Sequence, residues 1–168
     1  MASNSSFDIS TGADLQEVDN AVNQALKEIQ QRYDFKGTHC TIEFDRDKAV
    51  IRLHADDEFR MKSLLDVLSG RLIKRGVPAR NTTTGDFEPA TGTSVRCTVT
   101  LTQGIAADIA KQITRALKDN KEFRKVTASI QGDEIRVSSP SKDELQAVIA
   151  FLRAGDYGIE LKFGNFRS

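Results

Sequence analysis

The chain has 168 residues, of which 39% are hydrophobic and 29% are charged, an ordinary balance for a globular protein. Its 24 Lys and Arg residues equal its 24 Asp and Glu residues, which excludes the global basic field of a typical DNA-binding domain. Any site for a polyanion must therefore be a local patch. The length allows one large domain or two small ones.

The two cysteines, Cys40 and Cys97, have neither CxxC spacing nor the density of a disulfide framework, which indicates a reduced, intracellular protein. No apolar run approaches the roughly 20 residues that a membrane span needs, so we expect no membrane contact. The first residues lack the basic and apolar regions of a secretory signal. The sequence therefore predicts a cytoplasmic protein.

The first half of the chain predicts a strand, a helix and a pair of strands. A short strand at 6–10 precedes a helix that begins at Asp14 and ends near Tyr33, with apolar residues at helical spacing. Apolar and polar residues then alternate over 38–45 and 48–55, which is typical of two half-buried strands.

The loop between these two strands determines their predicted register. A two-residue loop at 46–47 pairs Phe44 with Ala49 and Ile42 with Ile51, so all apolar residues share one face. A slip by one residue would turn these side chains to the opposite face, which makes the predicted register specific.

A second helix carries apolar residues from Phe59 to Leu72, and Gly76 and Pro78 end it. The Thr-rich stretch 80–87 predicts a weak edge strand. Residues 88–92 are interpreted as a linker.

The same order of elements then repeats. In the second hairpin the turn Gly132-Asp133 predicts that Ile130 pairs with Ile135 and Ala128 with Val137. The other elements of this half are expected as a strand over 94–102, a helix from Ile105, hairpin strands over 126–131 and 134–138, a helix from Ser141 and a strand over 159–163.

A β-α-β-β-α-β order that occurs twice predicts an α+β protein made of two tandem ferredoxin-like domains, at 1–90 and 91–168. Each domain is expected to have a four-stranded antiparallel sheet with both helices on one face. Because only one face of each sheet is apolar, the other is open to solvent or to a partner.

Seven short segments resemble the YajQ family of bacterial nucleotide-binding proteins, and they follow in order over nearly the whole chain. They are 6–9, 32–37, 74–76, 103–105, 131–137, 142–146 and 165–167. The resemblance implies two tandem domains similar to RNA-recognition folds, with first strands 6–10 and 94–102 exchanged between the two sheets.

The resemblance also implies a non-catalytic nucleotide-binding protein whose ligand is a nucleotide, a cyclic dinucleotide such as cyclic di-GMP, or RNA. The alternative function is a protein-interaction adaptor that acts with a transcription regulator, which fits the neutral net charge and the two open sheet faces. Unlike an RNA-recognition domain, the chain has no aromatic residues at the outward positions of its central strands, and the RNP1 pattern is absent.

Six cations are selected as contacts for the phosphates of a nucleotide. Arg136 is expected in mid-strand on an open sheet face, Lys36 lies in the family-specific motif, and Arg167 belongs to the closing motif. The other three contacts come from two basic clusters, one around Arg75 and one over 111–125. The residues selected from them are Arg75, Lys111 and Lys125. The alternative for each cluster is a solvated helix face or helix end.

No catalytic or cofactor-binding motif is evident, so neither an enzyme nor a cofactor is expected. The hairpin register predicted above places His39 opposite His54, and two imidazoles could begin a metal site. No third ligand is evident nearby except Glu43 or Asp56, so the interpretation is two surface histidines and no metal. Cys40 and Cys97 are expected to point into the core as small hydrophobic side chains.

Overall fold

A computed structural model describes residues 4–168, and the chain divides into two compact units. The central unit is Ala13–Gln103. The terminal unit combines the chain up to Gly12 with Gly104–Ser168. Each unit has its own sheet, its own pair of helices and its own core.

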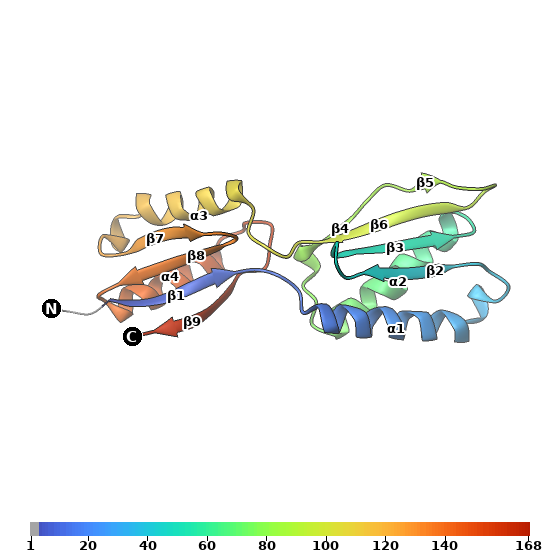
Figure 1. The fold of residues 1–168 in the computed structure, drawn as a ribbon, viewed down its shortest axis with the longest axis horizontal. Helices are drawn as coiled ribbons and strands as arrows, with labels where there is room; N and C mark the ends of the chain where they lie inside the picture. Colours follow the sequence, from blue (N-terminus) through green and yellow to red (C-terminus); the bar gives the residue numbers. More distant parts are fainter. Residues whose placement is uncertain (1–3) are drawn as a thin grey trace. The chain divides into compact units, whose positions relative to one another are not determined.

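The central unit contains two long helices and five strands (Figure 1). Its sheet has the order β2-β3-β6-β4, and the short β5 also pairs with β6. The elements are α1 (Leu15–Gln31), the short helix η1 (Tyr33–Phe35), β2 (Thr41–Asp45), β3 (Val50–Ala55), α2 (Glu58–Lys74), η2 (Ala79–Asn81), β4 (Thr82–Thr84), β5 (Glu88–Pro89) and β6 (Val95–Leu101).

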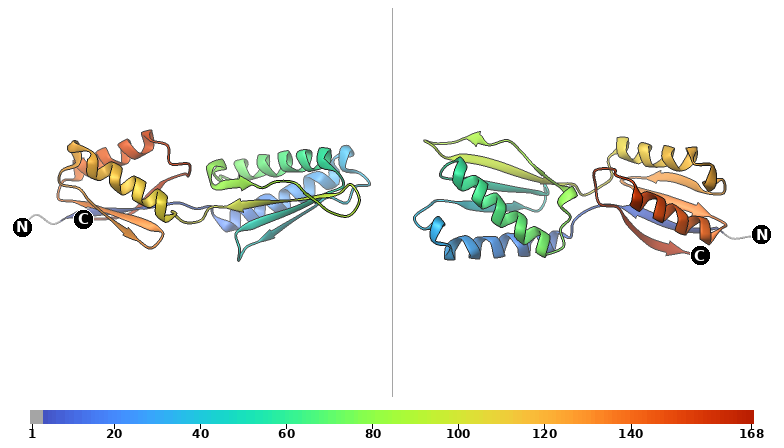
Figure 2. Two further views of the ribbon diagram at one scale, coloured as in Figure 1. Left: turned by 90° about the horizontal axis from the view of Figure 1, so that it is seen from above. Right: turned by 180° about the vertical axis from the view of Figure 1, so that it is seen from behind.

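The terminal unit contains two shorter helices and a four-stranded sheet with the order β7-β8-β1-β9. Figure 2 shows that the two helices of each unit cover the same face of its sheet. The elements are β1 (Ser5–Ser10), α3 (Ala107–Asp119), η3 (Lys121–Phe123), β7 (Thr127–Gln131), β8 (Glu134–Ser139), α4 (Lys142–Ala154) and β9 (Lys162–Arg167).

Both sheets have the ferredoxin-like order, in which the first strand lies between the third and the fourth, and the predicted α+β class is confirmed. In the terminal unit β1 occupies this place and pairs with β8 and β9. In the central unit β6 occupies it and pairs with β3 and β4. The terminal sheet thus takes this strand from a distant part of the chain, whereas the central sheet takes it from β6, which follows β5 in the same continuous segment.

Alternation of side chains explains why β1 and β6 occupy central places. Phe7 and Ile9 of β1 are fully buried, and Asp8 between them lies on the other face. The seven residues of β6 alternate between buried and exposed throughout, as predicted, with Cys97 and Val99 in the core. A strand with one apolar face is stabilised by helices on that face and by hydrogen-bonded neighbours on both edges.

The predicted register of the first hairpin was wrong by two residues, because the loop is longer than expected. Ile42 pairs with Leu53 and Phe44 with Ile51. Ala49, predicted to lie opposite Phe44, belongs to the turn and has a positive φ of 53°. A shift by two residues keeps every side chain on its predicted face, which is why the alternation alone could not reveal the longer loop.

The second hairpin has the predicted register, with Ile130 opposite Ile135 and Ala128 opposite Val137. Its turn is tight because Gly132 adopts a φ of 66° that other residues avoid.

Two other expectations were wrong. The supposed linker at 88–92 contains β5, which pairs with β6, so the central sheet has a fifth strand. The last strand begins at Lys162 and ends at Arg167, where 159–163 was predicted. The edge strand expected within 80–87 is present as β4.

Candidate functional site: a basic groove in the terminal unit

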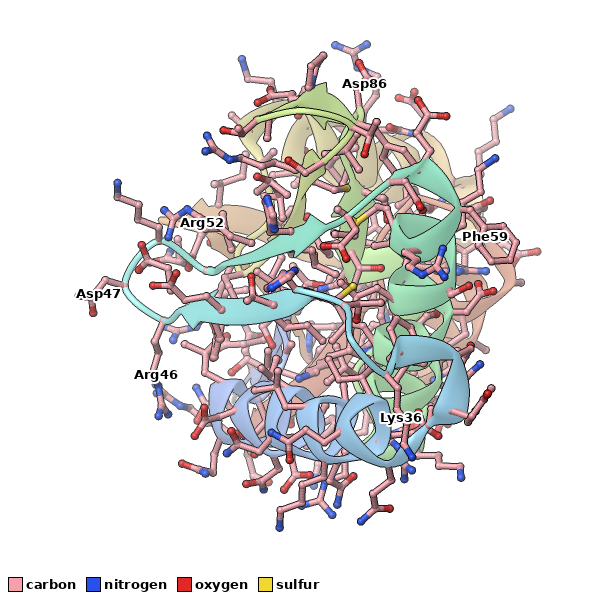
Figure 3. The ribbon with its side chains drawn as sticks, turned by 90° about the vertical axis from the view of Figure 1, so that its right-hand side faces the viewer. Lys36, Arg46, Asp47, Arg52, Phe59 and Asp86 are labelled. Atoms are coloured by element: carbon pink, nitrogen blue, oxygen red, sulfur yellow. The ribbon has the colours of Figure 1, made fainter. Side chains whose placement is uncertain are left out.

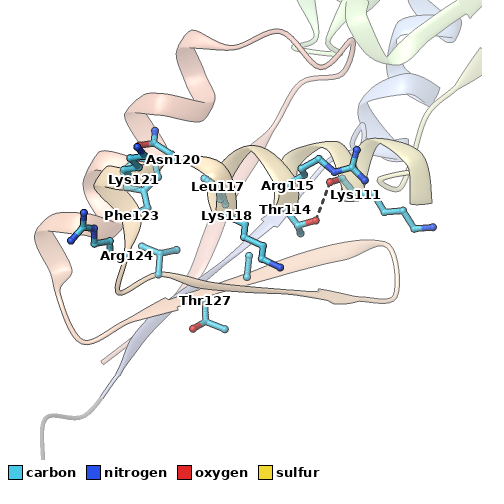
Figure 4. Close-up of a pocket in the computed structure, with 12 residues that line it drawn as sticks. Lys111, Thr114, Arg115, Leu117, Lys118, Asn120, Lys121, Phe123, Arg124 and Thr127 are labelled. Atoms are coloured by element: carbon cyan, nitrogen blue, oxygen red, sulfur yellow. Dashed lines mark hydrogen bonds between the residues drawn. The ribbon is translucent and has the colours of Figure 1, made fainter.

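A groove of about 750 Å³ runs along the terminal unit between the second half of α3, the η3 turn and β7 (Figure 4). Because β7 is the edge strand of its sheet, no further strand covers this side. The side chains along the groove are mostly basic or small and polar: Lys111, Thr114, Arg115, Lys118, Asn120, Lys121, Arg124 and Thr127.

The pattern of α3 places apolar and basic residues on opposite sides of the helix. Ile113 and Leu117 are buried in the core, while Lys111, Arg115 and Lys118 are exposed. Positions three and four residues apart lie on one side of an α-helix, so these three cations form a row. In Figure 4 the Lys118 side chain extends from α3 toward β7, and Arg115 and Lys111 project from earlier turns of the helix.

The η3 turn extends the row beyond the end of the helix. The Asn120 side chain accepts a hydrogen bond of 2.9 Å from the Glu122 backbone N–H, which fixes the start of the turn. Phe123 is 5% exposed and its ring contacts that of Phe151 edge-on, with centroids 5.5 Å apart. This anchor leaves Lys121 and Arg124 in solvent on either side of it.

Five cations line the groove, and no acidic side chain does. Within residues 4–168 none of the five forms an ion pair. Over 111–125 the sequence has six Lys or Arg residues and two acidic ones, a local net charge of +4 in a chain of net charge zero. Unpaired cations in a shallow concavity attract polyanions, because their field is not cancelled locally.

Of the six sequence-predicted contacts, the structure places only Lys111 in the lining of this groove. Lys125 is exposed and follows Arg124 directly in the chain. Arg136 and Arg167 belong to strands of the same unit, and Lys36 and Arg75 belong to the central unit. The six residues therefore do not form one site within either unit.

Arg136 lies on the open sheet face, as expected, but its charge is already paired. Its guanidinium donates to both carboxylate oxygens of Asp8, at 3.0 and 3.4 Å, and Asn165 donates to the same carboxylate at 2.6 Å. The hydrogen bond from Arg136 holds the pKa of Asp8 below its usual range, against the opposing effect of burial. This pair connects β8 to β1 across the sheet.

The remaining predicted contacts differ in whether another side chain already pairs with their charge. Nε of Arg75 lies 2.8 Å from a carboxylate oxygen of Glu17, so this pair joins the end of α2 to the start of α1. Lys36 is exposed, with its ammonium 5.8 Å from the centre of the Tyr33 ring. Arg167 is exposed at the end of β9.

The residues that sequence reasoning missed are Arg115, Lys118, Lys121 and Arg124. The sequence shows them as two separate clusters, one at helical spacing and one in the following loop, and each alone is typical of a solvated surface. What joins them is the short η3 turn, which continues the row beyond the end of α3 so that both clusters line one groove. The signal that could have found the site is a cationic helix face followed, shortly after the helix ends, by an apolar Phe123 between Lys121 and Arg124.

The histidines do not form the pair that the sequence suggested. His54 lies opposite Thr41, and its Nδ1 is 3.3 Å from the backbone oxygen of His39. Among residues 4–168 no three His, Cys, Asp or Glu side chains gather closely enough to hold a metal. Within the same range, no helix is long and apolar enough to cross a membrane.

Comparison with known proteins agrees with the fold. The sequence model of one family, described as "Nucleotide-binding protein YajQ-like", matches residues 5–167. A nucleotide-binding protein of Koribacter versatilis is 48% identical over 168 residues, covering 100% of this chain and 99% of its own. A protein of Heliobacterium modesticaldum named "Nucleotide-binding protein" is 49% identical over 168 residues, with 100% of both chains covered. With matches over its whole length, this chain belongs to the YajQ-like family of nucleotide-binding proteins.

Proposed function

We propose that this protein is a non-catalytic, cytoplasmic nucleotide-binding protein, and that the basic groove of the terminal unit holds the phosphates of its ligand. The family and the printed names of its relatives support binding of a nucleotide. The observation that carries the location is the row of five exposed cations with no acidic neighbour in the lining.

The geometry of the groove favours a ligand with several phosphates. The cations extend along about two helical turns and then around η3, so they can contact successive phosphates along a chain. The groove has no exposed aromatic ring that could enclose a base, because Phe123 is buried. Such a row is suited to the backbone of RNA or to a cyclic dinucleotide, and less suited to a single nucleoside.

Calorimetric titration would test the proposal with short single-stranded RNA, cyclic di-GMP, GTP and ATP. The variant Arg115→Ala/Lys118→Ala removes two charges from the centre of the groove. We expect it to weaken the best ligand by about tenfold or more, because hydrogen bonds to charged groups contribute strongly to binding.

A second double variant, Lys142→Ala/Lys162→Ala, is the matched control. It removes two exposed lysines from the same unit, one on α4 and one on β9, and neither lines the groove. Its affinity should remain close to that of the unchanged protein. Equal losses in both variants would show that only net charge matters, and would contradict the groove as the site.

A protein-interaction adaptor is a second candidate function, and one observation favours it. A groove of about 240 Å³, lined by aliphatic and polar side chains, lies in the central unit between α2 and the edge strand β4. Ile73 at its rim is 60% exposed. An edge strand beside a groove can accept an added strand from a partner. If a transcription regulator binds there, Ile73→Asp should abolish its co-elution with this protein after nuclease treatment.

A further inference from the structure

The helix-to-strand corner has the same order of elements in both units, and its backbone differs at the residue after the short helix, where Lys36 has a ψ of 133° and Arg124 a ψ of −31°. In the central unit it comprises the end of α1, η1 and the approach to β2, and in the terminal unit the end of α3, η3 and the approach to β7. The amide of Thr38 donates to the oxygen of Phe35 at 3.2 Å, and the amide of Val126 donates to that of Phe123 at 3.2 Å. The two corners correspond at a constant offset of 88 residues.

Burial follows the same offset. Ala25 and Ile29 of α1 correspond to Ile113 and Leu117 of α3, and all four are buried. The anchoring rings Phe35 and Phe123 are each 5% exposed. The two corners therefore expose equivalent positions to solvent.

These equivalent exposed positions carry different side chains in the two units. The five groove cations Lys111, Arg115, Lys118, Lys121 and Arg124 correspond to Asn23, Lys27, Gln30, Tyr33 and Lys36, all of which are exposed. Where the terminal unit has five cations, the central unit has two cations, two amides and one aromatic ring. The surface formed by these five residues of the central unit is called the α1 corner below.

Tyr33 is the unusual member of the α1 corner. It is 86% exposed, so its ring contributes little to the core. The ammonium of Lys36 lies 5.8 Å from its ring centre, and no hydrogen bond holds its hydroxyl among the residues described. Figure 3 shows Lys36 at the turn that follows α1, at the margin of the central unit.

The chemistry of the α1 corner matches an unpaired nucleobase with its phosphate. An exposed aromatic ring stacks on any base, and a neighbouring lysine can contact the phosphate. Amide side chains such as those of Asn23 and Gln30 can donate to and accept from the edge of a base. The basic groove has no exposed aromatic ring on which a base could stack, and its cations recognise phosphate.

We propose that the α1 corner is a second binding surface, where Tyr33 stacks on an unpaired nucleobase and Lys36 contacts its phosphate. This inference rests on the proposed binding of nucleotides, and it assigns recognition of the base to the central unit. The base can come from a free nucleotide or from a single-stranded oligonucleotide, which share this chemistry.

The variant Tyr33→Trp provides a direct readout, because the sequence contains no tryptophan. Stacking should quench the new indole emission on addition of a short oligouridylate. Uridine monophosphate is the second probe. Quenching by both probes indicates that the base comes from a free nucleotide, and quenching by the oligonucleotide alone indicates that it comes from a polymer. Inorganic polyphosphate, which has charge but no base, should leave the emission unchanged.

Affinity measurements complete the test. Tyr33→Ala should weaken the oligouridylate by about fivefold or more, since stacking on an aromatic ring contributes substantially for each base. Tyr33→Phe should retain the affinity. Ile130→Ala is the control, because Ile130 is also an exposed hydrophobic residue but lies on β7 of the other unit and outside the lining of the groove.

The outcomes separate this inference from the proposed function. If Tyr33→Trp is quenched by neither base-containing probe, or equally by polyphosphate, the α1 corner is not a base-binding surface, even if the groove variant loses affinity. If the Tyr33 variants respond as expected but Arg115→Ala/Lys118→Ala has no effect, the proposed groove fails and the α1 corner stands.

Discussion

Truncation of a single side chain in β1 should destabilise the terminal unit rather than the central unit. Phe7 follows the start of the described chain closely, and its ring is fully buried against residues far along the sequence. The rings of Phe163 and Phe166 lie with their centroids 6.0 and 5.9 Å from that of Phe7. Phe7→Ala removes this packing and leaves a cavity, which costs about 3–5 kcal/mol for a buried phenylalanine.

Hydrogen exchange followed by mass spectrometry measures where that loss falls. In Phe7→Ala the amides of β8 and β9 should lose protection by an amount close to the predicted free energy, while those of β3 keep theirs. Leu101→Ala in β6 is the mirror variant and should expose β3 instead, because β6 pairs with that strand. Loss of protection in β3 on truncating Phe7, with β8 unchanged, would refute the assignment of β1 to the terminal sheet.

Three further predictions concern stability and reactivity. Arg136 lowers the pKa of Asp8, so their contact stabilises the fold above the ordinary pKa of about 3.8, and this stabilisation is lost as the pH falls through the lower pKa of the folded state. Denaturation curves at several pH values should therefore show that Asp8→Asn is less stable at neutral pH and less sensitive to acid. An unchanged pH dependence would contradict this. Gly132→Ala should lower the free energy of unfolding by about 1 kcal/mol in urea titrations, because alanine is strained at a φ of 66°, and no change would argue against that turn. Iodoacetamide should label Cys40 before Cys97, because Cys97 is 2% exposed and burial raises the pKa of its thiol; equal rates would contradict its burial.

Much of the fold could be predicted because alternation and helical spacing are local signals. The register of the second hairpin follows from Gly132-Asp133, a turn that only a few backbone conformations can close. The first hairpin has no such glycine, and Ala49 adopts a left-handed conformation that an alanine does not predict. The error of two residues there arose from this missing turn signal.

The candidate site was harder to predict because it depends on contacts between distant residues. Arg136 was placed correctly on the open face, but its partner Asp8 is 128 positions away in the chain. The cations of 111–125 could be identified in the sequence. That they line one groove, however, depends on η3, whose Phe123 is buried in the core. Local patterns specify which residues are exposed, whereas tertiary contacts decide which of them remain unpaired.

The salt dependence of binding tests the central claim most directly. If a single-stranded RNA contacts all five groove cations, the logarithm of its affinity should fall with the logarithm of salt concentration at a slope of about −3.5, from about −0.7 for each neutralised phosphate. In Arg115→Ala/Lys118→Ala two contacts are lost, and the slope should shrink to about −2.1. A slope that is the same for this variant and the unchanged protein would show that the ligand phosphates lie elsewhere.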